Sequence, residues 1–408
     1  DGPPYAELHV IAVENGEDAA YITGRETVEH VAWTPDGKSI SFLAKRGKEK
    51  QTSLYSIPHG GGEARRLVSH DTDISEYSWS VDARHVAFLA TVKMAESKKK
   101  LEDKGFKAEV YEEDLDHVFV WIADTGDASA TPRRLEIAGS AVHVYFGRAD
   151  DNLTVVMAPT PLIDDEYMQS RIHFVDVITG KVVGRIENPG KLGPLVLSLD
   201  GKRLAFLSAE DIHDPADGVL MVSSTDEREP KSLIPEFEGH VSAAAWQDNN
   251  TVMFVADEGV ETTFNKIDSD GSGRKTIVPA GKAVMTSLSL SNDGQRGAFV
   301  ANTPLHPNEV FYMAHGDAEP KRMTNSNRWL DGIRFAKQET IEFKARDGLK
   351  LQGVLIHPLD EQPGKRYPLI VYVHGGPEAH EHNGWITNYS RPGQLAASRG
   401  FAVFYPNY

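Results

Sequence analysis

The sequence has 408 residues, of which 40% are hydrophobic and 25% charged, values typical of soluble globular proteins with two or three domains. Its net charge of −17 argues against binding nucleic acid through the phosphates, and no apolar run reaches the roughly 18 residues of a membrane-spanning helix. Because the sequence contains no cysteine, it excludes disulfides, zinc–thiolate sites and cysteine nucleophiles.

The first residues, "DGPPYAELHVIAVENG", contain neither the basic region nor the apolar region of a signal peptide. We therefore expect a cytoplasmic protein. A periplasmic or secreted location, reached after removal of a signal peptide, is the alternative, because periplasmic proteins can also lack cysteine.

One sequence unit recurs through the first three-quarters of the chain, at intervals of mostly about 45 to 50 residues. Each copy places phenylalanine six residues after an aspartate, and a weaker copy has Met157 six residues after Asp151. The five clear pairs are Asp36/Phe42, Asp82/Phe88, Asp200/Phe206, Asp248/Phe254 and Asp293/Phe299.

The unit reads as a hairpin, with a tight turn at the aspartate and a strand of alternating residues after it. A second hairpin follows each first one, which gives four antiparallel strands per period. This pattern predicts the blades of a β-propeller, whereas a two-sheet sandwich has no need for six copies of one hairpin. We interpret the turn aspartates as structural, because the spacing of a calcium-binding loop is absent.

Residues 7–22 resemble the second hairpin of a blade, but no first hairpin precedes them. The chain then has seven second hairpins and six first ones, which predicts a seven-bladed propeller over residues 1–324 with an incomplete first blade. We favour a missing N-terminal piece over completion of this blade by a C-terminal segment.

Residues 93–117 form an insertion between two copies of the repeat. Its run Lys98–Lys100 is interpreted as a solvated face, and lining the entrance to a substrate chamber is the alternative. The acidic residues after it could bind the free amino group of a peptide, although a solvated loop is the simpler interpretation. These residues are Glu112, Glu113, Asp114 and Asp116.

Beyond the repeats, residues 325–340 are predicted to be a linker and residues 341–408 the first part of an α/β domain. A hairpin turns at Asp347-Gly348, and "LIVYVHGGP" follows as a strand buried on both faces. "RPGQLAASRG" suits a helix closed by Gly400, and "FAVFYPNY" a second buried strand. Strand, glycine loop, helix and strand begin an α/β unit.

The glycine loop is formed by His374, Gly375, Gly376 and Pro377. An acyl-transfer intermediate needs N–H donors directed at its oxyanion, and glycine allows the backbone to approach it closely. The α/β-hydrolase fold has such a loop, of HGGG type, between its third strand and first helix. A tight turn at the exit of a strand is the alternative, and the position between two buried strands favours the oxyanion loop.

The blades together with "YPLIVYVHGGP" and "LAASRGFAVFYPNY" resemble the prolyl oligopeptidase family of serine peptidases, in particular its acylaminoacyl-peptidase and dipeptidyl-aminopeptidase branches. The resemblance implies a propeller that admits only short peptides to an α/β-hydrolase domain with a serine nucleophile and Asp and His partners. It also implies that the Gly376 N–H is an oxyanion donor, while Gly375, His374 and Pro377 shape the loop. One branch uses a tyrosine side chain as the donor, but the His-Gly-Gly-Pro motif predicts the backbone version.

The sequence departs from this family in one respect, because it contains no Gly-x-Ser-x-Gly motif. We therefore expect the catalytic triad to follow Tyr408, the chain to be a fragment shortened at both ends, and the chain by itself to be inactive. A propeller scaffold with an inactive hydrolase tail and an esterase of the same architecture are the alternatives. Short peptides are the expected partners, no cofactor is expected, and a homo-oligomer is possible.

The motif "HEH" at residues 380–382 invites a zinc-site interpretation, because two imidazoles lie close together. No third ligand has a diagnostic spacing, so a polar loop is preferred and no metal site is predicted. Other histidines lie in separate blades and are interpreted as packing or surface residues. They are His143, His173, His213 and His240.

Overall fold

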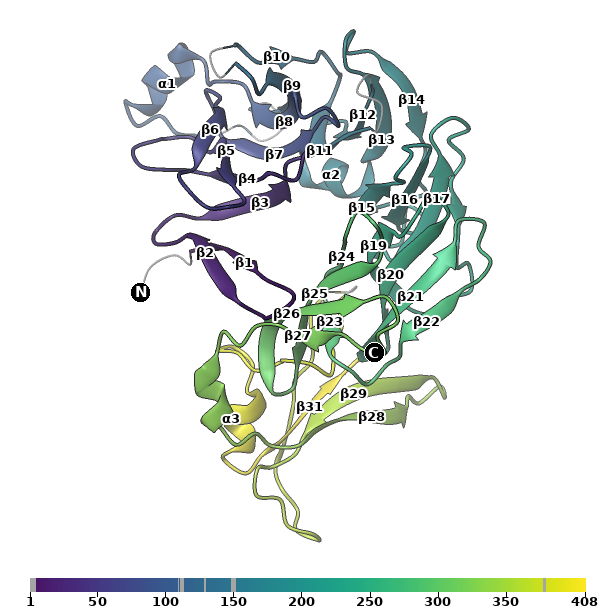
Figure 1. Cartoon of the computed structure of the whole chain (residues 1–408). Coiled ribbons are helices and arrows are strands. Elements are labelled where there is room, and N and C mark those ends of the chain that lie inside the picture. The colour runs from purple at the N-terminus through teal and green to yellow at the C-terminus, as the bar shows by residue number, and fades with distance from the viewer. Residues whose placement is uncertain (1–4, 109, 111–113, 128–129, 148–151, 377–378) are drawn as a thin grey trace. The chain divides into compact units, whose positions relative to one another are not determined.

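The computed structural model describes residues 5–108, 110, 114–127, 130–147, 152–376 and 379–408. Strands dominate these residues, and their helices are few and short (Figure 1). None of the helices in these ranges is long and apolar enough to cross a membrane. The mainly β fold class predicted from the sequence is confirmed, and the succession of antiparallel sheets is consistent with propeller blades.

The chain divides into two compact units, Asp1–Leu192 with Ser224–Pro230 and Gly193–Ser223 with Lys231–Tyr408. The first unit contains the hairpin of β1 (Leu8–Ile11) and β2 (Asp18–Ile22), as predicted for residues 7–22. Three four-stranded antiparallel sheets follow it. Their strands are β3 (Val28–Trp33), β4 (Ser39–Ala44), β5 (Ser53–Pro58) and β6 (Arg65–Val68); β7 (Ile74–Trp79), β8 (His85–Thr91), β9 (Val118–Asp124) and β10 (Arg133–Arg134); and β11 (Ser140–Phe146), β12 (Asn152–Ala158), β13 (Arg171–Asp176) and β14 (Val182–Ile186).

Two short helices interrupt these sheets, α1 (Glu96–Glu102) and α2 (Ile163–Met168). Helix α1 carries the lysine run of the insertion and buries none of its residues, so the predicted solvated face is confirmed. Lys98 forms an ion pair with Asp114, at 3.3 Å between Nζ and Oδ1. Of the acidic residues for which binding of a peptide amino group was the alternative to a solvated loop, Glu112 and Glu113 lie outside the described residues.

The second unit contains three further antiparallel sheets, although the first of them extends into the first unit at the ends of β15 and β17. Their strands are β15 (Leu192–Leu197), β16 (Arg203–Ser208), β17 (Val219–Ser224) and β18 (Lys231–Ser232); β19 (His240–Trp246), β20 (Thr251–Glu258), β21 (Glu261–Asp268) and β22 (Lys275–Val278); and β23 (Val284–Met285), β24 (Ser289–Leu290), β25 (Arg296–Thr303), β26 (His306–Ala314) and β27 (Lys321–Arg322).

The repeated aspartates close the turns between paired strands. Before β8, the Ser80 hydroxyl donates to Asp82 Oδ1 (2.7 Å), and the Arg84 N–H donates to the same oxygen (2.9 Å). These two hydrogen bonds, that of Arg84 first, lower the pKa of Asp82 because they stabilise its charged form. The same hydroxyl–carboxylate contact recurs in three other turns, in agreement with a structural role. The pairs are Thr34–Asp36, Ser198–Asp200 and Ser291–Asp293.

The phenylalanine of each unit occupies the core. Four of the five have no exposed surface, and Phe299 is 2% exposed. Met157, which replaces phenylalanine in the weaker copy, is also buried. The turn aspartate therefore precedes the strand whose apolar side chains fill the interior of each repeat.

The last sheet has the strand order β28–β29–β31–β30 and follows a short 3₁₀ helix, η1 (Arg328–Gly332). Its strands are β28 (Gln338–Lys344), β29 (Lys350–Ile356), β30 (Leu369–Val371) and β31 (Ala402–Pro406). The predicted turn between β28 and β29 is present, and Gly348 has a φ of +94°, which favours glycine. Strands β30 and β31 are parallel and the other pairs antiparallel.

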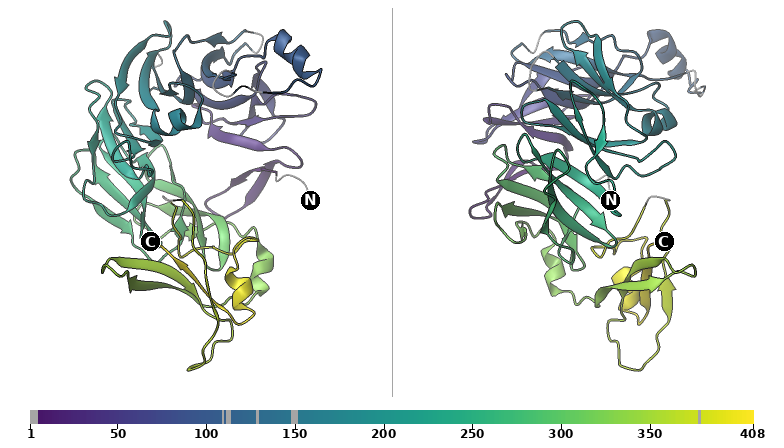
Figure 2. Two further views of the ribbon diagram at one scale, coloured as in Figure 1. Left: turned by 180° about the vertical axis from the view of Figure 1, so that it is seen from behind. Right: turned by 90° about the vertical axis from the view of Figure 1, so that its right-hand side faces the viewer.

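Helix α3 (Gly393–Ala397) lies between β30 and β31 in the chain and beside this sheet in space (Figure 2). Its Ala396 and Ala397 belong to the apolar core that the sheet forms. Gly400 has a φ of +83° and donates its N–H to Ala397 O, while the Phe401 N–H donates to Ala396 O. These two bonds form a Schellman motif, so the predicted closure at Gly400 is confirmed.

The two predicted buried strands have different environments. Val403 and Tyr405 of β31 are fully buried, as expected of an interior strand. The prediction that β30 is buried on both faces was wrong, because Leu369 and Val371 are 55% and 52% exposed. Within the described residues β30 pairs only with β31 and forms the edge of the sheet, which leaves these side chains uncovered.

Candidate functional site

The candidate site begins where β30 ends. The Tyr372 N–H still donates to Phe404 O, and the chain then leaves the sheet. The His374 ring stacks on the Tyr408 ring at 4.5 Å between centroids, and the Tyr408 hydroxyl donates to the His374 carbonyl. His374 is 9% exposed, so the first residue of the glycine loop is fixed by the segment that follows β31.

The two glycines after His374 present backbone rather than side chains. Gly376 has a φ of +138°, a conformation that favours glycine, and nothing lies within 4 Å of the position a Cβ would occupy on Gly375. Among the described residues, no acceptor bonds to the N–H of either glycine. A backbone N–H without an acceptor is what an oxyanion-binding loop has to offer. Pro377, the fourth residue of the motif, lies outside the described residues.

Glu381 holds the next segment, residues 379–383, against the sheet. Its N–H donates to Asn407 Oδ1 (2.8 Å), the Asn407 side chain donates to Glu381 O (3.1 Å), and Arg391 donates to Glu381 Oε2 (2.6 Å). The Glu381 side chain is 2% exposed, and the guanidinium compensates the buried charge. The guanidinium also lies 5.6 Å from the centre of the Tyr372 ring.

Asn383 attaches the other end of this segment to the sheet formed by β19–β22. Its N–H donates to Val260 O (2.6 Å), and its side-chain amide donates to Glu261 Oε1 (2.9 Å). Gln338 of β28 donates to Asn383 Oδ1 (3.1 Å). The segment is therefore held at both ends by buried or partly buried hydrogen bonds.

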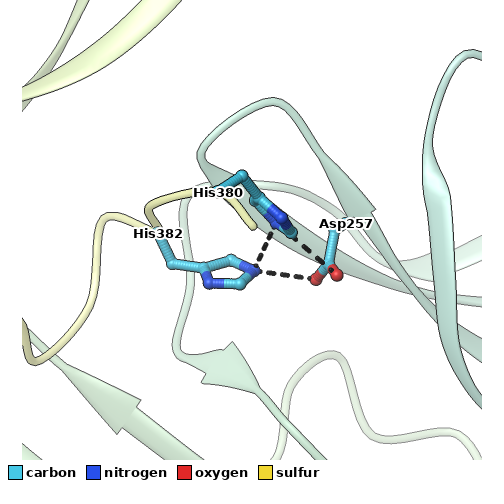
Figure 3. A group of neighbouring side chains, drawn as sticks. All are labelled: Asp257, His380 and His382. Atoms are coloured by element: carbon cyan, nitrogen blue, oxygen red, sulfur yellow. Dashed lines mark hydrogen bonds and ion pairs between the residues drawn. The ribbon is translucent and has the colours of Figure 1, made fainter. Parts of the chain in front are cut away.

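His380 and His382 flank Glu381, and both meet Asp257 of β20 (Figure 3). His382 Nε2 lies 3.0 Å from Asp257 Oδ1, and His380 Nε2 lies 3.6 Å from Oδ2. The two imidazole Nε2 atoms are 3.0 Å apart. We call these three residues the Asp–His–His cluster.

Burial lowers the pKa of His380 to about 4, and the neighbouring His382 contributes further to this shift. His380 is therefore neutral at physiological pH. His240 is paired with Asp257 across β19 and β20 and also disfavours the charged form of His380. The cluster thus combines at least one neutral imidazole with a buried carboxylate, which is a combination that can hold a divalent metal ion.

The structure brings together several of the residues singled out in the sequence. The glycine loop and the "HEH" motif belong to one continuous segment, and His240 lies near it. Asp257 could not be identified from the sequence, because it is more than a hundred residues from the motif and follows no spacing rule. The sequence shows only that Asp257 lies near the end of a strand, which does not indicate a metal ligand.

No protein-family model matches the sequence. The chain is similar to the uncharacterized peptidase YuxL of Bacillus subtilis, with 23% identity over 98% of this chain and 64% of that protein. It is also similar to dipeptidyl-peptidase 5 of Porphyromonas gingivalis, with 23% identity over 98% of this chain and 62% of that protein.

Among solved structures, the acylaminoacyl peptidase of Pyrococcus horikoshii has a TM-score of 0.72 and 18% identity, over 98% of this chain and 60% of that chain. This likeness concerns the fold. In these three comparisons the chain spans less than two thirds of the length of the matched protein. The relatives and structural neighbours of this chain are peptidases of the prolyl oligopeptidase family, which confirms the resemblance predicted from its sequence.

Proposed function

We propose that the chain is the propeller and the first part of the α/β-hydrolase domain of a serine peptidase that cleaves short peptides. The observation that carries the proposal is the unit of β30, glycine loop, α3 and β31, in which the two strands are parallel. In the α/β-hydrolase fold the loop at this position supplies an oxyanion donor. The Gly376 N–H, which has no acceptor among the described residues, suits that role.

The same features support a domain assignment. Residues 1–324 would form a seven-bladed propeller whose first blade contributes only the β1–β2 hairpin here. Residues 325–340 would be a linker that runs into the start of β28 at Gln338, and residues 341–408 the hydrolase part. The exposed apolar side chains of β30 support this assignment, because the parallel sheet of such a domain is covered on both faces. The propeller would limit access to short peptides.

The chemistry would be acyl transfer. The peptide carbonyl oxygen becomes an oxyanion when serine attacks, and the Gly376 N–H would stabilise it, while His374 and Gly375 shape the loop. This sequence contains no Gly-x-Ser-x-Gly motif, so the proposal places the Ser, Asp and His residues outside it. The relatives act, by their names, as a dipeptidyl-peptidase and an acylaminoacyl peptidase, which favours a substrate cleaved near its N-terminus.

The test compares the 408-residue chain with the product of the complete coding sequence. We expect the complete product to react with a fluorophosphonate and to hydrolyse aminoacyl- or acylaminoacyl-arylamides, and the 408-residue chain to do neither. An unreactive complete product would contradict the proposal and favour a propeller scaffold. Hydrolysis of simple esters without any hydrolysis of arylamides would instead assign an esterase.

A second measurement addresses the role of the propeller. The complete product should cleave a short peptide and leave the same sequence intact within a folded protein. Equal cleavage of both substrates would show that the propeller does not limit access. This result would leave the serine-peptidase chemistry standing, because the two measurements are independent.

A further inference from the structure

The Asp–His–His cluster brings together three potential metal ligands from two distant parts of the second unit. We propose that Asp257, His380 and His382 bind one divalent transition-metal ion, Zn²⁺ being the best match, and that the ion fastens residues 379–383 to β20. This site is independent of the proposed peptidase chemistry, because none of its residues belongs to the oxyanion loop or to the expected triad.

The distances between the two imidazole nitrogens and from each of them to the nearest Asp257 oxygen are close to those around a zinc ion. Ligand atoms about 2.0–2.1 Å from a tetrahedral ion are about 3.3 Å from one another. In the cluster the two imidazole nitrogens are 3.0 Å apart, and their distances to the Asp257 oxygens are 3.0 and 3.6 Å. A Zn²⁺ ion could therefore be bound with shifts of a few tenths of an ångström in the side chains.

Hydrogen bonds alone do not account well for the short contacts of His382 Nε2 with both His380 Nε2 and Asp257. A ring nitrogen of a neutral histidine either carries a proton and donates, or has a lone pair and accepts. If His382 Nε2 donates to Asp257, it has no lone pair for a proton on His380 Nε2. If it accepts from His380, its contact with the Asp257 carboxylate has no proton. One cation between the three side chains would accept a lone pair from each of them at once.

The backbone that carries the ligands is already held in place. Asp257 lies within β20, which is paired on both sides, with His240 of β19 and Thr262 of β21 opposite it. On the other side, the hydrogen bonds of Glu381 and Asn383 fix the segment that carries the two histidines. Binding would therefore cost little conformational entropy, which favours a metal site over an accidental meeting of side chains.

The ligand set and its exposure indicate which ion fits. Two imidazoles favour Zn²⁺ and its neighbours in the first transition series over Mg²⁺ and Ca²⁺, which prefer oxygen ligands. The Asp257 side chain is 9% exposed, whereas those of His380 and His382 are 28% and 27% exposed. Water can therefore reach the histidine side and provide a fourth ligand, which completes a tetrahedron.

Binding by the 408-residue chain can be measured directly, because the experiment does not depend on peptidase activity. After treatment with a chelator and its removal, the protein is titrated with Zn²⁺ in competition with a chromophoric chelator. We expect one equivalent of zinc, and with Co²⁺ we expect the intense ligand-field absorption of a tetrahedral site. Absence of a stoichiometric site would overturn the proposal.

Variants identify the ligands. His382→Ala and Asp257→Asn should each weaken zinc binding by about 100-fold or more, because each removes one of three protein ligands. His213→Ala is the matched control, since His213 is an exposed histidine of the same unit, and it should bind zinc like the parent. If all three variants bind equally well, the zinc lies elsewhere and the proposal is wrong.

Hydrogen–deuterium exchange tests the fastening of residues 379–383 and also guards against misfolded variants. Zinc should slow exchange in peptides covering this segment in the parent and in His213→Ala, and should leave exchange unchanged in His382→Ala. Native exchange elsewhere in His382→Ala shows that this variant is folded. Zinc binding without slower exchange in the segment would contradict the fastening role.

Discussion

The turn before β8 and the segment after β30 both concentrate polar groups, but they satisfy them over very different distances in the sequence. In the turn, Ser80, Asp82 and Arg84 bond to one another within five positions. In the segment, Glu381 bonds to Arg391 and Asn407, and His382 reaches Asp257. The turn is thus a local structure that can recur in every sequence repeat, whereas the segment exists only when distant elements have assembled.

This difference has a consequence for stability and function. A locally satisfied turn contributes a similar amount wherever it recurs, and losing one leaves the others intact. The segment after β30 depends on several elements at once, so a small backbone change in the adjacent glycine loop should affect chemistry more than folding. The largest expected effect therefore concerns Gly376.

Gly376→Ala should reduce kcat for arylamide hydrolysis by the complete protein about 100-fold or more, with KM nearly unchanged. Alanine does not readily adopt a φ of +138°, so the loop would shift and misdirect the N–H that the proposed mechanism uses. Gly364→Ala is the matched control, because Gly364 also has a positive φ, +78°, and open space around it. Equal losses in the two variants would show that backbone strain alone, rather than an oxyanion donor, explains the result.

Features that depend on neighbouring residues could be predicted from the sequence, whereas contacts between distant segments could not. The repeats, the turn aspartates and the buried phenylalanines were predictable because turn and strand preferences depend on neighbouring residues. The Schellman motif at Gly400 is local in the same way. The exposure of Leu369 was not predictable, since an apolar run does not reveal whether a strand lies inside a sheet or at its edge.

The Asp–His–His cluster could be predicted from the sequence only in part. The "HEH" motif drew attention to two ligands, but the third, Asp257, comes from another sheet. Such a meeting is decided by the packing of residues 379–383 against β20, which depends on the hydrogen bonds of Asn383 to Val260 and Glu261. No spacing within the sequence encodes these contacts.

Removal of a hydroxyl from the turn between β15 and β16 should have an effect of intermediate size. Ser198 is fully buried, and its hydroxyl donates to Asp200 and accepts the Arg203 N–H. Ser198→Ala should lower the free energy of unfolding by about 1 kcal/mol, measured by urea unfolding, because both hydrogen bonds are lost. Ser80→Ala in the first unit should cost a similar amount, and Ser398→Ala, at an exposed site, should change stability by less than about 0.5 kcal/mol. Unequal costs for Ser198 and Ser80 would contradict the equivalence of the turns.

The smallest expected effect tests a contact between neighbouring sheets of the first unit. His143 of β11 lies 2.8 Å from Glu76 of β7, and this hydrogen bond raises the pKa of His143. A raised pKa in the folded state means that the contact stabilises the protein fully below the ordinary pKa, about 6.5, and that this stabilisation is lost as the pH rises through the folded-state pKa. Glu76→Gln should therefore cost about 0.5 kcal/mol at about pH 5.5, a value kept small because His143 is half-exposed, and almost nothing at about pH 9. Glutamine can still accept a hydrogen bond from the Val144 N–H. The pH-dependent part of the change in unfolding free energy therefore reports the loss of the Glu76 charge. A cost that grows with pH in urea unfolding would show that the charged pair does not stabilise this contact.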